Sequence, residues 1–169
     1  MNRTNLEEKI LEWSNKFVKK LNDYELKEII EKKNLSKFNS EILKKFSEYS
    51  NWDFTPDFTI LLKKKKLKKK EKEKEYELIL INRENKSLGL RSIGEIMSYN
   101  RICDPMYSFL VSDKGHSNEI SYFMINDTFR DKLMNFNDKS LIIFSFDESG
   151  SKVKENSIIP PNLKRLLSE

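Results

Sequence analysis

Cysteine, glycine and proline are scarce in this sequence of 169 residues, which contains one cysteine, four glycines and four prolines. A single cysteine, Cys103, cannot form an internal disulfide, so we expect a packed thiol in a reducing, cytoplasmic environment. So little glycine and proline is atypical of a loop-rich or disordered chain. No apolar run approaches the roughly 18 residues that span a bilayer, and the N-terminus lacks the apolar segment of a signal peptide. We therefore expect a structured intracellular protein without a membrane span.

Several motifs that carry chemistry are also missing. The sequence has no glycine-rich phosphate loop, no G-x-S-x-G and no cysteine pair, which removes support for nucleotide hydrolases, esterases and zinc fingers. The one histidine, His116, follows Gly115 in a predicted turn, and we expect it to be an exposed loop residue.

Charged side chains are abundant, at 35% of the sequence against 37% hydrophobic, and the net charge is +5. Most of the excess comes from one lysine block within residues 63–75. One interpretation is a solvated hairpin extension held open by like-charge repulsion. The other is a phosphate-binding finger beside an active site, whose binding would be sequence-independent and steeply salt-dependent.

Hydrophobic spacing predicts the order of the elements. Spacings of three and four predict helix over 4–33, with Asn22 and Asp23 as an interruption, and over 40–49, 91–101 and 127–135. Apolar runs predict strands over 57–62, 76–82, 106–112 and 141–146, whereas 117–125 is compatible with either element. The apolar face of 4–33 is interpreted as a core face, with a homodimer seam as the alternative.

One stretch, residues 52–102, resembles the PD-(D/E)XK nuclease superfamily. An acidic residue, Asp57, follows Pro56 at the start of a strand, a hairpin comes next, and a helix bearing Tyr99 closes the stretch. The resemblance covers roughly residues 38–146. It implies an α/β fold with a mixed central β-sheet flanked by helices, in an α-β-β-α-β restriction-endonuclease-like core over 38–150. Residues 1–37 would form an N-terminal helical extension, and 151–169 a C-terminal tail.

The resemblance also implies a Mg²⁺ or Mn²⁺ site, since phosphodiester hydrolysis by such enzymes uses a carboxylate-bound divalent cation. Asp57 fits the first metal ligand. Literal matching makes Glu84 the second ligand and Lys86 the residue that positions water. Hairpin geometry with a turn near Lys69 instead aligns Asp57 with Leu80 and Asn82, which would be a degenerate motif. A helical acid, Glu41 or Glu95, is the remaining substitute.

Other residues would contact the nucleic acid. Glu95 and Tyr99 lie four apart on one helix face and resemble the Gln-x-x-x-Tyr helix of several of these nucleases, and Arg101 follows them. The lysines assigned to the phosphate backbone are Lys63, Lys64, Lys65, Lys66, Lys68, Lys69 and Lys70.

Three functions remain open on the sequence alone. The first is a metal-dependent nuclease acting on DNA. The second is the same fold without catalysis, kept as a DNA-binding or scaffold module, which Leu80 and Asn82 favour. The third is an unrelated α/β interaction protein that dimerises through residues 4–33.

Overall fold

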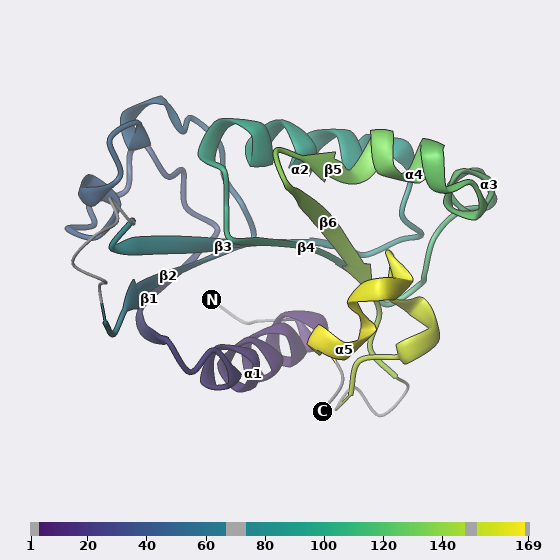
Figure 1. Cartoon of the computed structure of the whole chain (residues 1–169), viewed down its shortest axis with the longest axis horizontal. Coiled ribbons are helices and arrows are strands. Elements are labelled where there is room, and N and C mark those ends of the chain that lie inside the picture. The colour runs from purple at the N-terminus through teal and green to yellow at the C-terminus, as the bar shows by residue number, and fades with distance from the viewer. Residues whose placement is uncertain (1–3, 67–73, 148–151, 168–169) are drawn as a thin grey trace.

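A six-stranded mixed β-sheet separates two covering layers in the computed structural model, which describes residues 4–66, 74–147 and 152–167 (Figure 1). The strand order is β1-β2-β3-β4-β6-β5. The strands are β1 (Tyr24–Glu31), β2 (Phe58–Lys64), β3 (Tyr76–Glu84), β4 (Tyr107–Ser112), β5 (Asn135–Phe136) and β6 (Lys139–Phe144). The helices are α1 (Asn5–Lys20), α2 (Leu90–Cys103), α3 (Asn118–Ile125), α4 (Asp127–Met134) and α5 (Lys164–Leu167).

Strand direction changes across the sheet. The strands β1, β2 and β3 are antiparallel neighbours, whereas β4 pairs in parallel with β3 and β6 in parallel with β4. The first five residues of β2 are all buried, as are four consecutive residues of β3. Such continuous burial arises when both faces of a strand are covered. The carboxyl ends of β3, β4 and β6 therefore meet at one edge of the sheet.

The helix α1 covers one face of the sheet, and the C-terminal segment lies beside it (Figure 1). Its apolar stripe buries Leu6, Ile10 and Phe17 in the same cluster as Phe109 and Phe144 of the central strands. The stripe follows the spacing of an amphipathic helix.

The opposite face is covered by two different kinds of segment. The helices α2, α3 and α4 lie over β3, β4 and β6, while the irregular segment 32–57 covers the other half of the sheet (Figure 1). Leu35, Leu43 and Trp52 from that segment are buried against Leu61 and Leu80. Among the described residues, no helix has both the length and the apolar character needed to cross a membrane.

Most of the predicted elements after residue 56 are confirmed. The expected strands correspond to β2, β3, β4 and β6, and the expected helices over 91–101 and 127–135 correspond to α2 and α4. The ambiguous stretch 117–125 is helical, and Ser117 caps it by accepting a hydrogen bond from the backbone N–H of Ile120.

The predicted helix over 4–33 is wrong beyond Lys20, because residues 24–31 form the edge strand β1. The pairing of β1 with β2 shifts register between Leu26 and Glu28. Such a bulge adds a residue to one strand and interrupts the alternation of side chains. The apolar residues Leu26, Ile29 and Ile30 consequently fall at spacings of three and four, which imitates a helix.

The predicted helix over 40–49 is also wrong. Two single 3₁₀ turns stand there, at Leu43–Lys45 and Tyr49–Asn51. The hydroxyl of Ser40 accepts hydrogen bonds from the backbone N–H groups of Ile42 and Leu43 and starts the first turn. Only a short apolar stripe was available for a helix, and burial of Leu43 against the strands of the sheet overrides it.

Residues 4–37 are therefore part of the main fold and not a separate extension, since β1 belongs to the sheet and α1 to the core. The apolar face of α1 that was considered as a dimer seam is buried within the chain. A dimer formed through that face would have to displace the sheet.

Candidate functional site

Asp57 lies immediately before β2, where its carboxylate is mostly enclosed, with a side-chain exposure of 23%. The carboxylate accepts a hydrogen bond of 2.9 Å from the backbone N–H of Arg83, and its other oxygen is 3.4 Å from Nε of Arg83. Burial raises the pKa of Asp57, although the N–H and the charge of Arg83 act in the opposite direction. Asp57 is thus held by the end of β3, as a strand-end site requires.

Glu7 on α1 is the second carboxylate of this site, and it is not among the site residues predicted from the sequence. It forms a capping box with Thr4, whose backbone N–H donates to Oε2 of Glu7 at 2.7 Å. The other oxygen pairs with Lys32 and lies 3.1 Å from the guanidinium of Arg83. The T-x-x-E pattern at the helix start was the available signal, but it predicts only a cap.

Arg83 joins the two carboxylates. Its guanidinium contacts both Asp57 and Glu7, and Lys32 adds a second cation beside Glu7. The backbone N–H of Lys32 also donates to the carbonyl of Asp57. Burial alone would raise the pKa of Glu7, but Lys32, the Thr4 N–H and Arg83 together lower it to about 2. Two acids and two bases therefore form one charge-balanced network.

The hairpin register separates Asp57 from the predicted partners Glu84 and Lys86. Phe58 pairs with Ile81 without a bulge, so Asp57, one residue earlier, is level with Asn82. Side chains alternate along a strand, which puts Glu84 on the opposite face from Arg83. The carboxylate of Glu84 instead accepts a hydrogen bond of 2.8 Å from Ser92 on α2. The described pairs of the hairpin, from Phe58 with Ile81 to Lys63 with Tyr76, show no register shift that would bring Glu84 and Lys86 level with Asp57, and Lys86 is exposed.

The Glu95 and Tyr99 pair does form on α2, with the phenol donating to Oε1 of Glu95 at 2.9 Å. The ring of Tyr99 stacks on Phe54, with centroids 4.3 Å apart. Burial and the neighbouring Glu95 raise the pKa of Tyr99 to about 12, with a smaller effect from Asp57. Arg101 is exposed near the end of the same helix.

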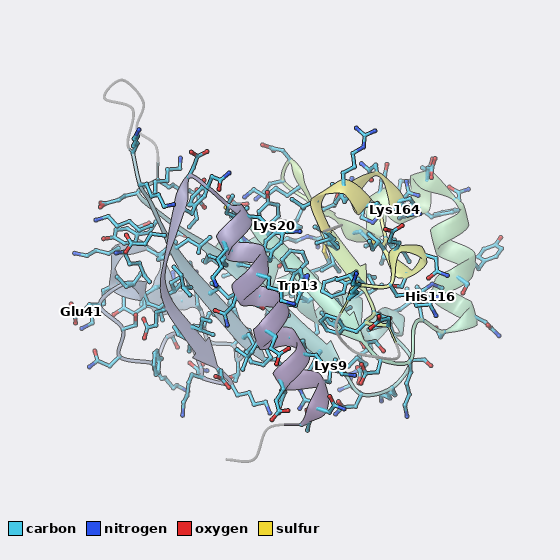
Figure 2. All side chains as sticks on the ribbon, turned by 90° about the horizontal axis from the view of Figure 1, so that it is seen from below. Lys9, Trp13, Lys20, Glu41, His116 and Lys164 are labelled. Atoms are coloured by element: carbon cyan, nitrogen blue, oxygen red, sulfur yellow. The ribbon has the colours of Figure 1, made fainter. Side chains whose placement is uncertain are left out.

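The remaining helical acid, Glu41, is not placed to replace Glu84. It is an exposed residue paired with Lys44, and Figure 2 shows it at the edge of the molecule, away from α1. Cys103 is buried as expected, and burial raises the pKa of its thiol to about 12.

The lysine block lies at the other end of the hairpin. Lys63 and Lys64 end β2, about 20 Å along the strand from Asp57 at the usual rise per residue. Lys63 pairs with Glu75 at 3.1 Å, and Nζ of Lys65 donates to the carbonyl of Asn22. The prediction of a finger beside the active site is therefore wrong for the described lysines. Lys68, Lys69 and Lys70 lie outside the described residues, and Lys66 is exposed.

An open cleft of about 810 Å³ lies at the carboxyl edge of β4 and β6. Lys9, from the turn of α1 that follows Glu7, lines it together with Lys114, His116 and Lys154. None of these three ammonium groups forms an ion pair with another described residue. Asp113 and Asp147 also line the cleft, so its lysines exceed its carboxylates by one charge.

A metal ion does not fit the Asp57 network as it is arranged. Within residues 4–66, 74–147 and 152–167, no group of three or more His, Cys, Asp or Glu side chains is placed to hold one. A divalent cation between Asp57 and Glu7 would take the position of the Arg83 guanidinium.

Comparison with protein-family models, with curated proteins and with solved structures finds no match to this chain.

Proposed function

We propose that the protein binds nucleic acid at the carboxyl edge of its sheet and does not cleave it, as a catalytically inactive module with a restriction-endonuclease-like core. The observation that carries binding is the cleft lined by Lys9, Lys114 and Lys154, none of which forms an ion pair within the described part of the chain. Ammonium groups without a protein partner attract phosphate and release counterions when they bind it. Ligands of open α/β sheets commonly bind beyond the carboxyl ends of the strands.

The order of the elements supports the nuclease-like core. The expected strand, strand, helix and strand occur as β2, β3, α2 and β4, whereas the first helix expected for the core, over 40–49, does not form and α1 from the expected extension covers the sheet instead. The hairpin supports the inactive interpretation, because the register gives Asp57 a level neighbour, Asn82, that is an amide.

Metal-dependent DNA hydrolysis remains a second candidate because one guanidinium brings Asp57 and Glu7 together. Two carboxylates suffice for Mg²⁺ when phosphate and water complete its coordination. In that case Arg83 would have to withdraw from both acids before the metal could enter.

One experiment compares the two candidates. Fluorescently labelled single-stranded and duplex DNA would be titrated with the protein at low salt and then incubated with Mg²⁺ or Mn²⁺. Asp57→Asn, Glu7→Gln and the exposed control Glu8→Gln would be tested in parallel. Binding by all forms without cutting supports the inactive module.

Metal-dependent cutting that is lost in Asp57→Asn and Glu7→Gln, but kept in Glu8→Gln, would establish the nuclease and overturn the inactive proposal. Absence of binding to either DNA form would overturn both candidates and leave the α/β interaction protein.

A further inference from the structure

A second, smaller hollow adjoins the basic cleft. It has a volume of about 310 Å³, and His116, Ser121 and Asn156 line both hollows. The other walls of the smaller hollow are Ile158, Ile159, Pro161 and Lys164. Figure 2 shows Lys9 on α1, and His116 across from it beside the C-terminal segment that carries Lys164. A basic space and a largely apolar space thus share one wall of polar side chains.

The loop that carries His116 is fixed by backbone hydrogen bonds. The N–H of Leu88 donates to the carbonyl of Gly115, and the N–H of Ser117 donates to the carbonyl of Leu88. Gly115 has a φ of +66°, which a side chain would oppose at this turn. Nδ1 of His116 lies 3.0 Å from the hydroxyl of Ser121, which orients the ring and leaves Nε2 for a ligand.

The facing C-terminal segment is equally anchored. The N–H of Lys154 donates to the carbonyl of Ser145, and the N–H of Ser145 donates to the hydroxyl of Ser157. Ser145 follows the end of β6 directly, so the position of Lys154 is set by the sheet. The His116 loop and the C-terminal segment, which face each other across the hollows, are therefore both ordered before any ligand binds. This order reduces the entropy lost on binding.

We propose that the two hollows together bind one nucleotide that carries a terminal phosphate. The phosphate monoester, a dianion at neutral pH, lies in the basic cleft among Lys9, Lys114 and Lys154. The base lies against Ile158, Ile159 and Pro161, where the amide of Asn156 is available to its polar edge. This proposal rests on the proposed function. It identifies the phosphorylated end of a nucleic-acid strand as the group that binds at the carboxyl edge of the sheet.

The chemistry of the two hollows favours this occupant. Small-molecule sites usually have volumes of about 300–1,000 Å³ and combine apolar walls with a few polar groups. A phosphate alone leaves the apolar hollow empty, and a nucleoside alone leaves three ammonium groups unpaired. A phosphate monoester carries more charge than an internal phosphodiester and therefore gains more from the three ammonium groups, a gain that Asp113 and Asp147 in the same cleft reduce for both.

The same chemistry occurs in a free nucleotide and in the terminal nucleotide of a strand, so the test has two arms. In the first, isothermal titration compares adenosine 5′-monophosphate, adenosine and inorganic phosphate as ligands of the full chain. We expect the monophosphate to bind most tightly. In the second, single strands with a 5′-phosphate, a 3′-phosphate or neither are compared at equal salt.

The variant Lys9→Gln with Lys154→Gln should weaken monophosphate binding by about tenfold or more, because it removes two charge-assisted hydrogen bonds to the phosphate. Lys19→Gln with Lys132→Gln removes the same charge from exposed positions on α1 and α4 and is the matched control. Asn156→Ala should weaken the monophosphate but leave inorganic phosphate unchanged.

The proposal is overturned if the monophosphate binds no better than adenosine, or if the control pair weakens it equally. Strands that bind without any preference for a terminal phosphate would overturn it while leaving the proposed function in place. Monophosphate binding without strand binding would instead retain the nucleotide site, assign it to a free nucleotide, and overturn the proposed function.

Discussion

At the scale of single residues, the network around Arg83 combines four charged side chains that are largely shielded from water. Glu7 has a side-chain exposure of 4% and Arg83 of 14%. Charges this enclosed are stable only while each has its partners, and removing one partner leaves the others desolvated and unpaired. Asp57 and Glu7 are candidates for a chemical role because they are largely enclosed, and the same enclosure makes their ion pairs important for the stability of the fold.

Replacing Arg83 with methionine should lower the free energy of unfolding by about 2–3 kcal/mol, because Glu7 then keeps only Lys32 and Asp57 loses its cation. Urea denaturation followed by circular dichroism measures the change. Arg101→Met removes an exposed arginine from α2 and should change the stability by less than about 0.5 kcal/mol. Equal losses in the two variants would show that the network does not stabilise the fold.

Acid should destabilise the wild-type protein partly through Glu7. Its pKa falls from 4.5 to about 2 on folding, so the unfolded chain binds the proton first as the pH decreases. The stability that Glu7 contributes is therefore fully present above pH 4.5 and is lost as the pH falls toward 2. Glu7→Gln should lose less stability than the wild type over this interval, as measured by thermal melts from pH 5 to pH 2.5. Parallel curves for the two proteins would contradict this.

At the scale of elements, the sequence predicts the helices and strands whose hydrophobic pattern is not interrupted by tertiary contacts. The apolar runs of β2 and β3 and the helical spacing of α2 are unbroken, and the positions of these elements follow directly. The bulge between Leu26 and Glu28 is set by pairing with β2, so nothing local indicates it. The wrong helix over 24–33 is a consequence of that bulge.

The candidate site was predictable to the same extent. Asp57 is predictable because it lies between Pro56 and the apolar run that forms β2. Its link to Glu7 through Arg83, and the backbone hydrogen bond that it accepts from Lys32, depend on how α1 and the end of β1 meet the β2–β3 hairpin, which no local pattern encodes. The shared cleft likewise combines Lys9, His116 and Lys154, which are far apart in the sequence.

Asp104 connects three elements at the end of α2. It adopts a left-handed conformation with a φ of +47°, and its carboxylate pairs with Lys74 and Lys139 and accepts from Asn137. Asp104→Ala should destabilise the fold by about 2 kcal/mol, through backbone strain together with the lost ionic hydrogen bonds. Asp104→Asn should lose less, because asparagine tolerates this backbone conformation. Chemical denaturation of both variants tests this, and an alanine variant no less stable than the asparagine variant would contradict it.

At the scale of the whole molecule, the net charge of +5 describes the surface less well than its distribution does. The described lysines at the hairpin end of the sheet include Lys63 and Lys74, which are paired with Glu75 and Asp104. Those at the carboxyl edge, Lys9, Lys114 and Lys154, form no ion pair with any residue that the structure describes. Nucleic acid should therefore bind more through the few free lysines at the carboxyl edge than through the paired lysines of the block.

This distribution predicts the salt dependence of strand binding. Each lysine that contacts a phosphate contributes about 0.7 to the slope of log K against log salt on single strands. Lys9→Gln with Lys154→Gln should therefore reduce the magnitude of the slope by about 1.4, measured by fluorescence anisotropy between 50 and 200 mM salt. Lys19→Gln with Lys132→Gln should leave the slope nearly unchanged, since these exposed lysines lie outside the cleft. If both pairs reduce the slope equally, binding follows the total charge of the protein. If only the first pair does, the strand contacts the carboxyl edge.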